Sequence, residues 1–164
     1  ENLDSKKIDN SECVVIDNFN EQINEKKLYS FLNHVNQLDK FISKDLCEKY
    51  NFFSDQIYLV GFSQGCMISY TLSINYPKKY KKVIGLSGKI PYEILKHDEK
   101  EDYTDHNFFC SHGIYDQVIP IEIGRESDKW LSKNKISHKY LEFDSAHGIN
   151  AENSEQMNHW LNKN

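Results

Sequence analysis

The sequence predicts a three-layer α/β fold with a mostly parallel sheet. Strand-length apolar segments alternate with helix-length segments along the chain, an order that is typical of parallel sheets. A serine between two glycines stands at one strand-to-helix junction. With 164 residues and 38% hydrophobic content, the chain is long enough for one buried core and too short for two comfortable domains. We therefore expect residues 1–164 to form a single domain.

The chain before residue 56 supplies one strand candidate and one long helix. Residues 12–16, Glu-Cys-Val-Val-Ile, form a short β-branched segment. Residues 25–50 place apolar side chains on one stripe, which predicts an amphipathic helix. The stripe consists of Leu28, Phe31, Leu32, Val35, Leu38, Ile42 and Leu46.

The next elements frame a short motif. Residues 61–65 read Gly-Phe-Ser-Gln-Gly, between a predicted strand at 56–60 and a predicted buried helix at 66–74 that Pro77 ends. Gly-x-Ser-x-Gly also occurs by chance, so the pattern alone is weak. The strand before it and the helix after it make Ser63 a candidate nucleophile.

The two glycines of this motif have a predicted structural role. So sharp a turn strains the backbone of Ser63 and brings strand and helix close together, so we expect Gly61 and Gly65 to avoid side-chain clashes. The Ser63 hydroxyl would project from the carboxyl edge of the sheet. The backbone N–H of Gln64 would then point at the atom that the hydroxyl attacks.

A serine hydroxyl is a poor nucleophile at neutral pH, so it needs a histidine base and a carboxylate that orients the histidine. The apolar segment 108–113 predicts a strand, and Asp116 follows it in a loop. The segment 139–143 alternates like a last strand, and His147 lies in the loop beyond it. The order Ser, Asp, His accompanies this kind of strand-to-helix turn.

Other side chains compete for these roles. Asp144 is the rival acid, three residues before His147, but it fits a loop cap and does not fit the chain order, so Asp116 is preferred. His112 precedes a glycine at a strand end, where a structural or supporting role fits better than that of the base. The remaining histidines are interpreted as solvated: His34, His97, His106, His138 and His159.

Four motifs in this order resemble the phospholipase/carboxylesterase family of α/β-hydrolases, which includes the acyl-protein thioesterases. They are Gly-Phe-Ser-Gln-Gly at 61–65, Leu-Ser-Gly-Lys-Ile-Pro at 86–91, His-Gly-Ile-Tyr-Asp-Gln-Val-Ile-Pro at 112–120 and Ala-His-Gly-Ile at 146–149. The similarity covers about residues 25 to 164. One departure is Cys66, where the family usually has a second glycine.

The resemblance implies an α/β-hydrolase fold and hydrolysis of carboxylic esters or thioesters through an acyl-enzyme. The triad would be Ser63, Asp116 and His147, with no cofactor and a small-molecule or lipid-like substrate. A shallow acyl-accepting surface is expected to include Gly88, Ile90, Pro91 and Val118.

The resemblance is incomplete before Ser63. Members of the family have several strands there, and a His-Gly-containing loop that supplies a second oxyanion N–H. Neither is recognisable in this sequence, so we expect the fold to lack its usual N-terminal strands and the sequence to be N-terminally incomplete. This difference motivates an alternative hypothesis, in which the chain is a non-catalytic α/β-hydrolase-like fragment or binding module.

Composition argues against several other classes of protein. The net charge is −5 and the basic residues are scattered, so we expect no nucleic-acid partner. No apolar segment approaches the ~20 residues of a transmembrane helix, and no metal-ligand pattern is present. Cys13, Cys47, Cys66 and Cys110 lie far apart, which favours free thiols in a reducing, cytoplasmic location. Homo-oligomer formation stays open.

Overall fold

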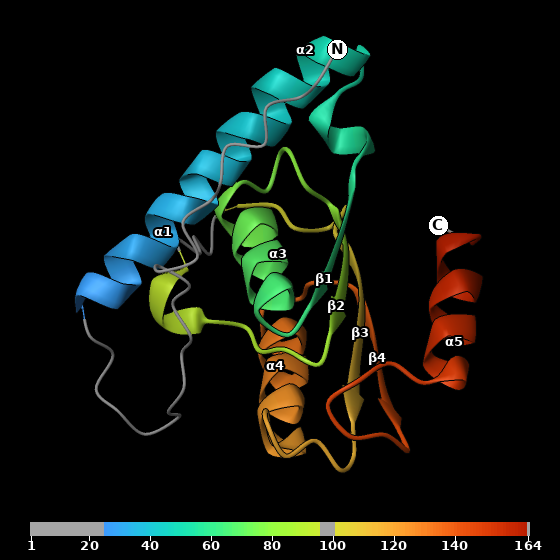
Figure 1. The fold of residues 1–164 in the computed structure, drawn as a ribbon. Helices are drawn as coiled ribbons and strands as arrows, with labels where there is room; N and C mark the ends of the chain where they lie inside the picture. Colours follow the sequence, from blue (N-terminus) through green and yellow to red (C-terminus); the bar gives the residue numbers. More distant parts are fainter. Residues whose placement is uncertain (1–24, 96–100, 164) are drawn as a thin grey trace, which may run out of the picture.

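The computed structural model describes residues 25–95 and 101–163. These residues form a parallel sheet of four strands in the order β1-β2-β3-β4 (Figure 1). The strands are β1 Tyr58–Phe62, β2 Lys82–Leu86, β3 Asn107–Gly113 and β4 His138–Phe143. The predicted α/β class with a parallel sheet is confirmed, whereas the strand predicted at 12–16 lies outside the described residues.

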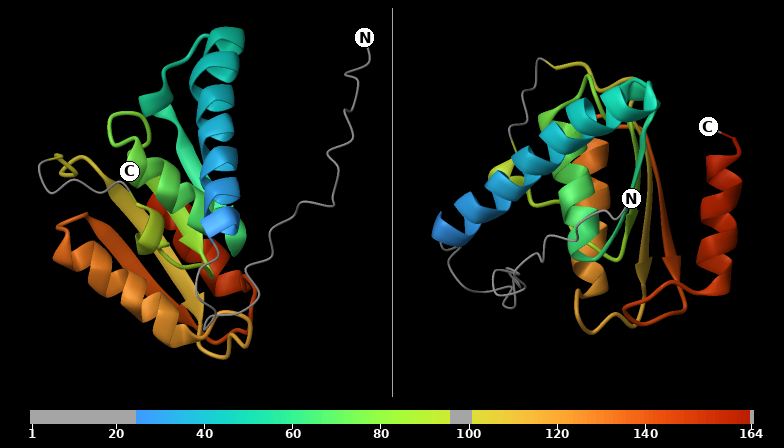
Figure 2. Two further views of the ribbon diagram at one scale, coloured as in Figure 1. Left: turned by 90° about the vertical axis from the view of Figure 1, so that its left-hand side faces the viewer. Right: turned by 45° about the horizontal axis from the view of Figure 1, so that its top comes forward.

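Helices cover both faces of the sheet, which gives the predicted three layers. In Figure 1 and Figure 2, α1, α3 and α4 lie on one side and α5 lies on the other. The α-helices are α1 Glu25–Lys40, α2 Cys47–Tyr50, α3 Gln64–Asn75, α4 Ile121–Lys133 and α5 Ala151–Leu161. Short 3-10 turns occur at Ser54–Gln56 and Tyr92–Ile94. None of the helices in the described part of the chain is long and apolar enough to cross a membrane.

The long helix predicted at 25–50 is present but irregular. A π-helical segment, Phe41–Leu46, separates α1 from α2. Phe31 and Val35 of the predicted stripe are buried in the main core, which α1 shares with α3 and the sheet. Polar contacts add a second attachment: the Tyr80 hydroxyl donates to Asp39 Oδ1 at 2.9 Å, and Lys79 Nζ lies 2.8 Å from Asp39 Oδ2.

The segment between β2 and β3 is rich in charged residues, yet part of it is buried. Ile94, Tyr103 and His106 are buried. The His106 ring packs edge-on against Tyr103, with centroids 5.0 Å apart, and lies 6.1 Å from the ring of Phe108 at the start of β3. His106 is therefore a core residue and not the solvated histidine that its charged neighbours suggested.

The burial of His106 predicts acid sensitivity. Burial lowers the pKa of the imidazole below its usual range because the charged form loses hydration, and Lys81 acts in the same direction. In the unfolded chain a histidine titrates near ~6.5. Below about that pH the unfolded chain therefore binds a proton that the folded chain resists, and folding stability falls as the pH falls.

We expect the wild type to lose more unfolding free energy than His106→Phe between about pH 7.5 and about pH 5.5, because phenylalanine does not titrate. Because a single histidine exchanges one proton, the losses of unfolding free energy in the two proteins can differ by at most about 1.4 kcal/mol per pH unit. Urea unfolding at the two pH values measures this difference, and His159→Phe is a control at an exposed histidine. Parallel pH dependence of wild type and His106→Phe would contradict the assignment.

Candidate active site

Ser63 occupies the sharp turn between β1 and α3. Its backbone has φ 53° and ψ −117°, a region that residues with a side chain rarely adopt. The Ser63 N–H donates to the Leu86 carbonyl of the neighbouring strand at 2.8 Å, which ties the turn to the sheet. This is the strained turn that the sequence predicts.

The two glycines of the motif behave differently from each other. A Cβ at Gly61 would lie 2.1 Å from the Gly65 carbonyl oxygen, so the predicted steric need is real at this position. A Cβ at Gly65 would meet no described atom within 4 Å, so the clash expected there is wrong. Gly65 instead lines an apolar groove of about 400 Å³, together with residues of α1, the π-helical segment, β1 and α3 that include Leu38 and Ile42.

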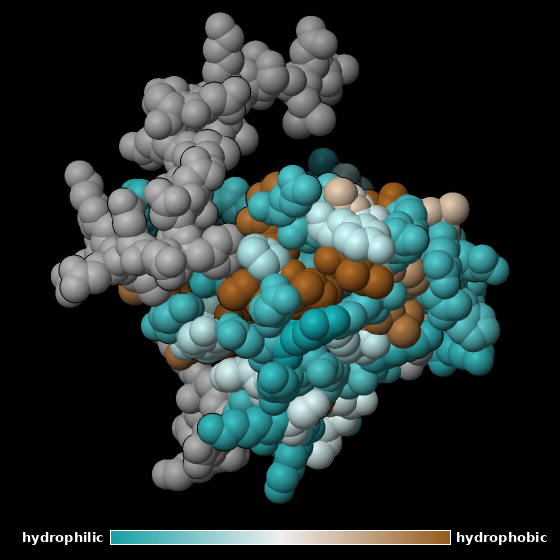
Figure 3. Space-filling view, turned by 90° about the horizontal axis from the view of Figure 1, so that it is seen from below, coloured by the Kyte–Doolittle hydropathy of each residue, from teal (hydrophilic) through white to brown (hydrophobic). Residues whose placement is uncertain are grey.

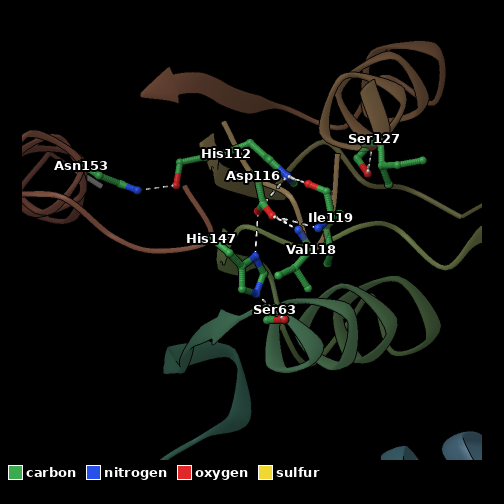
Figure 4. Close-up of polar contacts among 10 residues, drawn as sticks. Ser63, His112, Asp116, Val118, Ile119, Ser127, His147 and Asn153 are labelled. Carbon is green, nitrogen blue, oxygen red and sulfur yellow. Dashed lines mark hydrogen bonds and ion pairs between the residues drawn. The ribbon is translucent and has the colours of Figure 1, made fainter. Parts of the chain in front are cut away.

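The structure brings Ser63, Asp116 and His147 together at the carboxyl ends of the strands (Figure 4). His147 Nε2 lies 3.0 Å from Ser63 Oγ, and His147 Nδ1 lies 2.7 Å from Asp116 Oδ2. The Asp116 side chain is fully buried and that of His147 is 18% exposed. With Nδ1–H donating to the carboxylate, Nε2 is left as the acceptor for the serine hydroxyl.

Backbone groups hold the Asp116 carboxylate in place. Its Oδ1 accepts hydrogen bonds from the N–H groups of Val118 at 2.9 Å and Ile119 at 2.8 Å, so Oδ2 is directed at His147. The rival acid Asp144 is exposed, and its backbone carbonyl contacts the Asn150 amide at 3.4 Å. Geometry therefore favours Asp116 over Asp144 as the partner of His147.

The loop after β2 lies beside Ser63, since a Cβ at Gly88 would come 2.8 Å from the Ser63 carbonyl oxygen, but the residues predicted to form an acyl surface there are buried. Ile90 is fully buried and its N–H donates to Ser127 Oγ at 3.0 Å. Gly88 and Pro91 are also buried, and a Cβ at Gly88 would lie 2.5 Å from the Cβ of Cys66. Gly88 packs against α3 and Ile90 is bonded to α4, so the prediction that Ile90 forms part of an exposed acyl-accepting surface is corrected. Val118 alone of this predicted group is exposed, at 59%.

Apart from Val118, the exposed apolar side chains near the triad belong to residues that were not predicted to bind substrate. The Phe62 ring lies 4.9 Å from the His147 ring, centroid to centroid, and stays 39% exposed. Figure 3 shows hydrophobic side chains gathered across this face. Exposed apolar residues at or just after the carboxyl ends of β1, β3 and β4 are Phe62, Ile114, Tyr115, Val118 and Ile149, which we call the apolar rim. Their position directly beside predicted site residues is the signal that could have identified them.

Cys66 has a packing role. Its thiol lies in the core with Cys110 and the Tyr70 hydroxyl, and a Cβ at Gly85 would come within 2.8 Å of its sulfur. Burial raises the pKa of Cys66 far above its usual range and that of Cys110 to about 12, so both thiols stay protonated and unreactive. Cys47 is half-buried, and Cys13 lies outside the described residues.

Three further histidines, His34, His138 and His159, lie apart from Ser63. His34 and His159 are exposed, as predicted. His138, at the opposite end of the sheet, is half-buried and contacts Asp128 Oδ1 at 2.9 Å through Nε2. In the part of the chain that the structure describes, His, Cys, Asp and Glu side chains form no group of three that could hold a metal ion.

Solved structures share this fold. A carboxylesterase from Bacillus cereus superposes with a TM-score of 0.74 at 17% identity, covering 85% of this chain and 63% of that chain. SOBER1 from Arabidopsis thaliana superposes with a TM-score of 0.69 at 18% identity, covering 87% and 67%. At these identities the likeness concerns the fold, which is that of the α/β-hydrolases.

Sequence comparison assigns the family. Acyl-protein thioesterase 1 of Yarrowia lipolytica is 28% identical over 118 residues, which are 68% of this chain and 51% of the relative. Acyl-protein thioesterase 1 of Saccharomyces cerevisiae is 31% identical over 96 residues, 57% of this chain and 41% of the relative. The chain thus spans about half the length of the curated relatives it matches. Because the profile of the phospholipase/carboxylesterase family matches residues 15–164, the chain belongs to that family.

Proposed function

We propose that this chain carries the catalytic triad of a serine hydrolase that cleaves carboxylic esters or thioesters through an acyl-enzyme intermediate. The observation that carries the proposal is the continuous hydrogen-bonded line from Ser63 Oγ through His147 to Asp116, at 3.0 and 2.7 Å. Membership of the phospholipase/carboxylesterase family supports the same reaction class.

In the proposed reaction, the Ser63 hydroxyl attacks the carbonyl carbon while His147 Nε2 takes its proton. Asp116 keeps the proton of the neutral imidazole on Nδ1 and stabilises the imidazolium as it forms. His147 then protonates the leaving alcohol or thiol, and the acyl group remains on Ser63. Water attacks the acyl-enzyme with His147 as base, which releases the carboxylic acid and restores the serine.

The developing oxyanion would be met by the first turn of α3. Gln64 is the first residue of that helix, and its backbone N–H lies at the positive end of the helix dipole. Preorganised N–H donors at this position stabilise the tetrahedral intermediate more than the planar substrate. The strained Ser63 backbone supports this arrangement, because such strand-to-helix turns present the serine hydroxyl beside the N–H of the next residue.

The apolar rim favours an acyl group over a charged or sugar-like substrate. Two of its members flank the triad directly: Phe62 contacts the His147 ring, and Val118 follows Asp116 in the loop. A hydrocarbon chain laid along this surface would remove apolar side chains from water, at about 25 cal/mol per Å² buried. Relatives described as acyl-protein thioesterases agree with such a substrate class.

A fluorophosphonate probe tests the proposal, since it forms a covalent bond with an activated serine. We expect one label per chain, located at Ser63 by peptide mass spectrometry, and loss of labelling in urea. Turnover of p-nitrophenyl esters and of matched acyl thioesters, compared across chain lengths, then identifies the preferred acyl group. A folded sample that neither takes the label nor cleaves any of these substrates would reject the proposal in favour of a non-catalytic domain.

A further inference from the structure

A second histidine, His112, is the penultimate residue of strand β3 and lies next to the Asp116 side chain of the proposed triad. Its side chain is 1% exposed and its Nε2 lies 3.4 Å from Asp116 Oδ2, the oxygen that also faces His147. We propose that His112 is a positioning residue that holds the Asp116 loop in the geometry required by His147. The inference rests on the proposed function, because it concerns how the same triad is assembled.

The hydrogen bond of His112 defines its protonation at one ring atom. Nε2 lies 2.7 Å from the carbonyl oxygen of Ile119, and a carbonyl can only accept, so Nε2 carries a proton. The same nitrogen lies 3.4 Å from Asp116 Oδ2. Figure 4 shows His112 between Asp116 and Ile119 on the side away from Ser63.

Ile119 is therefore fixed at both of its backbone polar groups. Its N–H donates to Asp116 Oδ1 at 2.8 Å, while its carbonyl accepts from His112 at 2.7 Å. Through these two bonds, His112 of strand β3 fixes the loop segment that orients the Asp116 carboxylate. Without the His112 N–H, the buried Ile119 carbonyl loses this partner, and the link to the strand that remains is the 3.3 Å bond from the Asp116 N–H to the Gly113 carbonyl.

Helix α4 packs closely against the imidazole of His112. A Cβ at Gly124 would lie 2.6 Å from His112 Nδ1 and 2.9 Å from the Tyr140 hydroxyl, so the glycine lets the helix approach the imidazole closely. The charged groups near the ring are Asp116 in the loop and Glu142 on β4, which is paired with Arg125 of α4 at 2.7 Å. With so little room, His112 is limited to one ring orientation.

The experiment compares His112→Phe, which keeps the ring volume but removes the N–H, with His112→Gln, whose amide can reach the Ile119 carbonyl. His112→Asn carries the same amide on a shorter side chain. His138→Phe is a matched control, because His138 also pairs with a backbone carbonyl, Ile136 O at 2.7 Å, and with a carboxylate, Asp128 at 2.9 Å. The probe is the downfield proton NMR signal of His147 Nδ1–H, assigned by its loss in His147→Gln, together with kcat and KM for a p-nitrophenyl ester.

We expect His112→Phe to weaken or shift the His147 signal and to lower kcat by about 10- to 100-fold with KM nearly unchanged, as a small misplacement of a catalytic group does. His112→Gln should restore most of both, and His138→Phe should change neither. If His112→Phe fails to fold, the Gln and Asn variants carry the same comparison, since only the longer amide reaches Ile119.

Two results would overturn the proposal: a His147 signal and kcat unaffected by His112→Phe, or Gln and Asn variants that behave alike. Failure of the proposed function looks different. In that case the wild type shows no ester turnover, while the NMR signal still reports whether His112 positions Asp116 and His147.

Discussion

Replacing Ser63 with alanine is expected to lower ester turnover by about 10⁴-fold or more, by analogy with triad deletions in other serine hydrolases. The only oxygen that can attack the carbonyl in the proposed mechanism is then gone. Because the Ser63 side chain is half-buried and its hydrogen bond is the 3.0 Å contact with His147, the thermal unfolding midpoint should stay nearly unchanged. Turnover of a p-nitrophenyl ester and a thermal melt measure the two quantities.

A matched control is available on the protein surface. Ser132 lies exposed on α4, away from the triad, so Ser132→Ala should keep both the rate and the melting temperature. His147→Ala should reproduce the loss seen with Ser63→Ala, since the hydroxyl is inactive without its base. A Ser63→Ala protein that keeps more than about a tenth of the wild-type rate would show that another group performs the reaction.

The sequence predicted the parts of the site that depend on local backbone demands. The turn at Ser63 needs a strand, a strained residue and a helix in immediate succession. Gly61 is required because a Cβ there would lie 2.1 Å from the Gly65 carbonyl oxygen in the helix. The carboxyl ends of parallel strands meet at one edge, so Asp116 and His147 could be placed beside Ser63 from chain order alone.

Features that depend on distant partners were missed. Ile90 is buried because Ser127, on α4, accepts its N–H, and neither residue signals the other in sequence. His106 is drawn into the core by Tyr103 and Phe108 despite its charged neighbours. The open space at Gly65 belongs to an apolar groove that the N-terminal helical region and β1 also line. The Gly-x-Ser-x-Gly pattern carries no information about that groove, so it could not indicate that a side chain at Gly65 would avoid a clash. The π-helical segment Phe41–Leu46 was missed as well, because its apolar residues continue the spacing that predicts a regular α-helix.

Asp116→Asn should separate orientation from binding. The new amide keeps an oxygen that can accept from Val118 and Ile119, so the loop can persist. Its NH₂ group would then face His147 Nδ1 in place of Oδ2, which lies at 2.7 Å in the wild type. A donor facing a donor favours the tautomer with its proton on Nε2, and that nitrogen can no longer accept the proton of Ser63.

The expected result for Asp116→Asn is a loss of about 10⁴ in kcat with substrate binding nearly intact, which is the size of effect that a wrong histidine tautomer produces. Asp144→Asn is the matched control, because Asp144 is exposed and contacts Asn150 through its backbone carbonyl. That variant should stay within a few-fold of the wild type. Steady-state kinetics on one ester, with thermal melts to exclude unfolding, give the comparison. If Asp144→Asn proved the more damaging change, the acid would have to be reassigned to the loop that carries His147, and the 2.7 Å contact of Asp116 would be a structural bond alone.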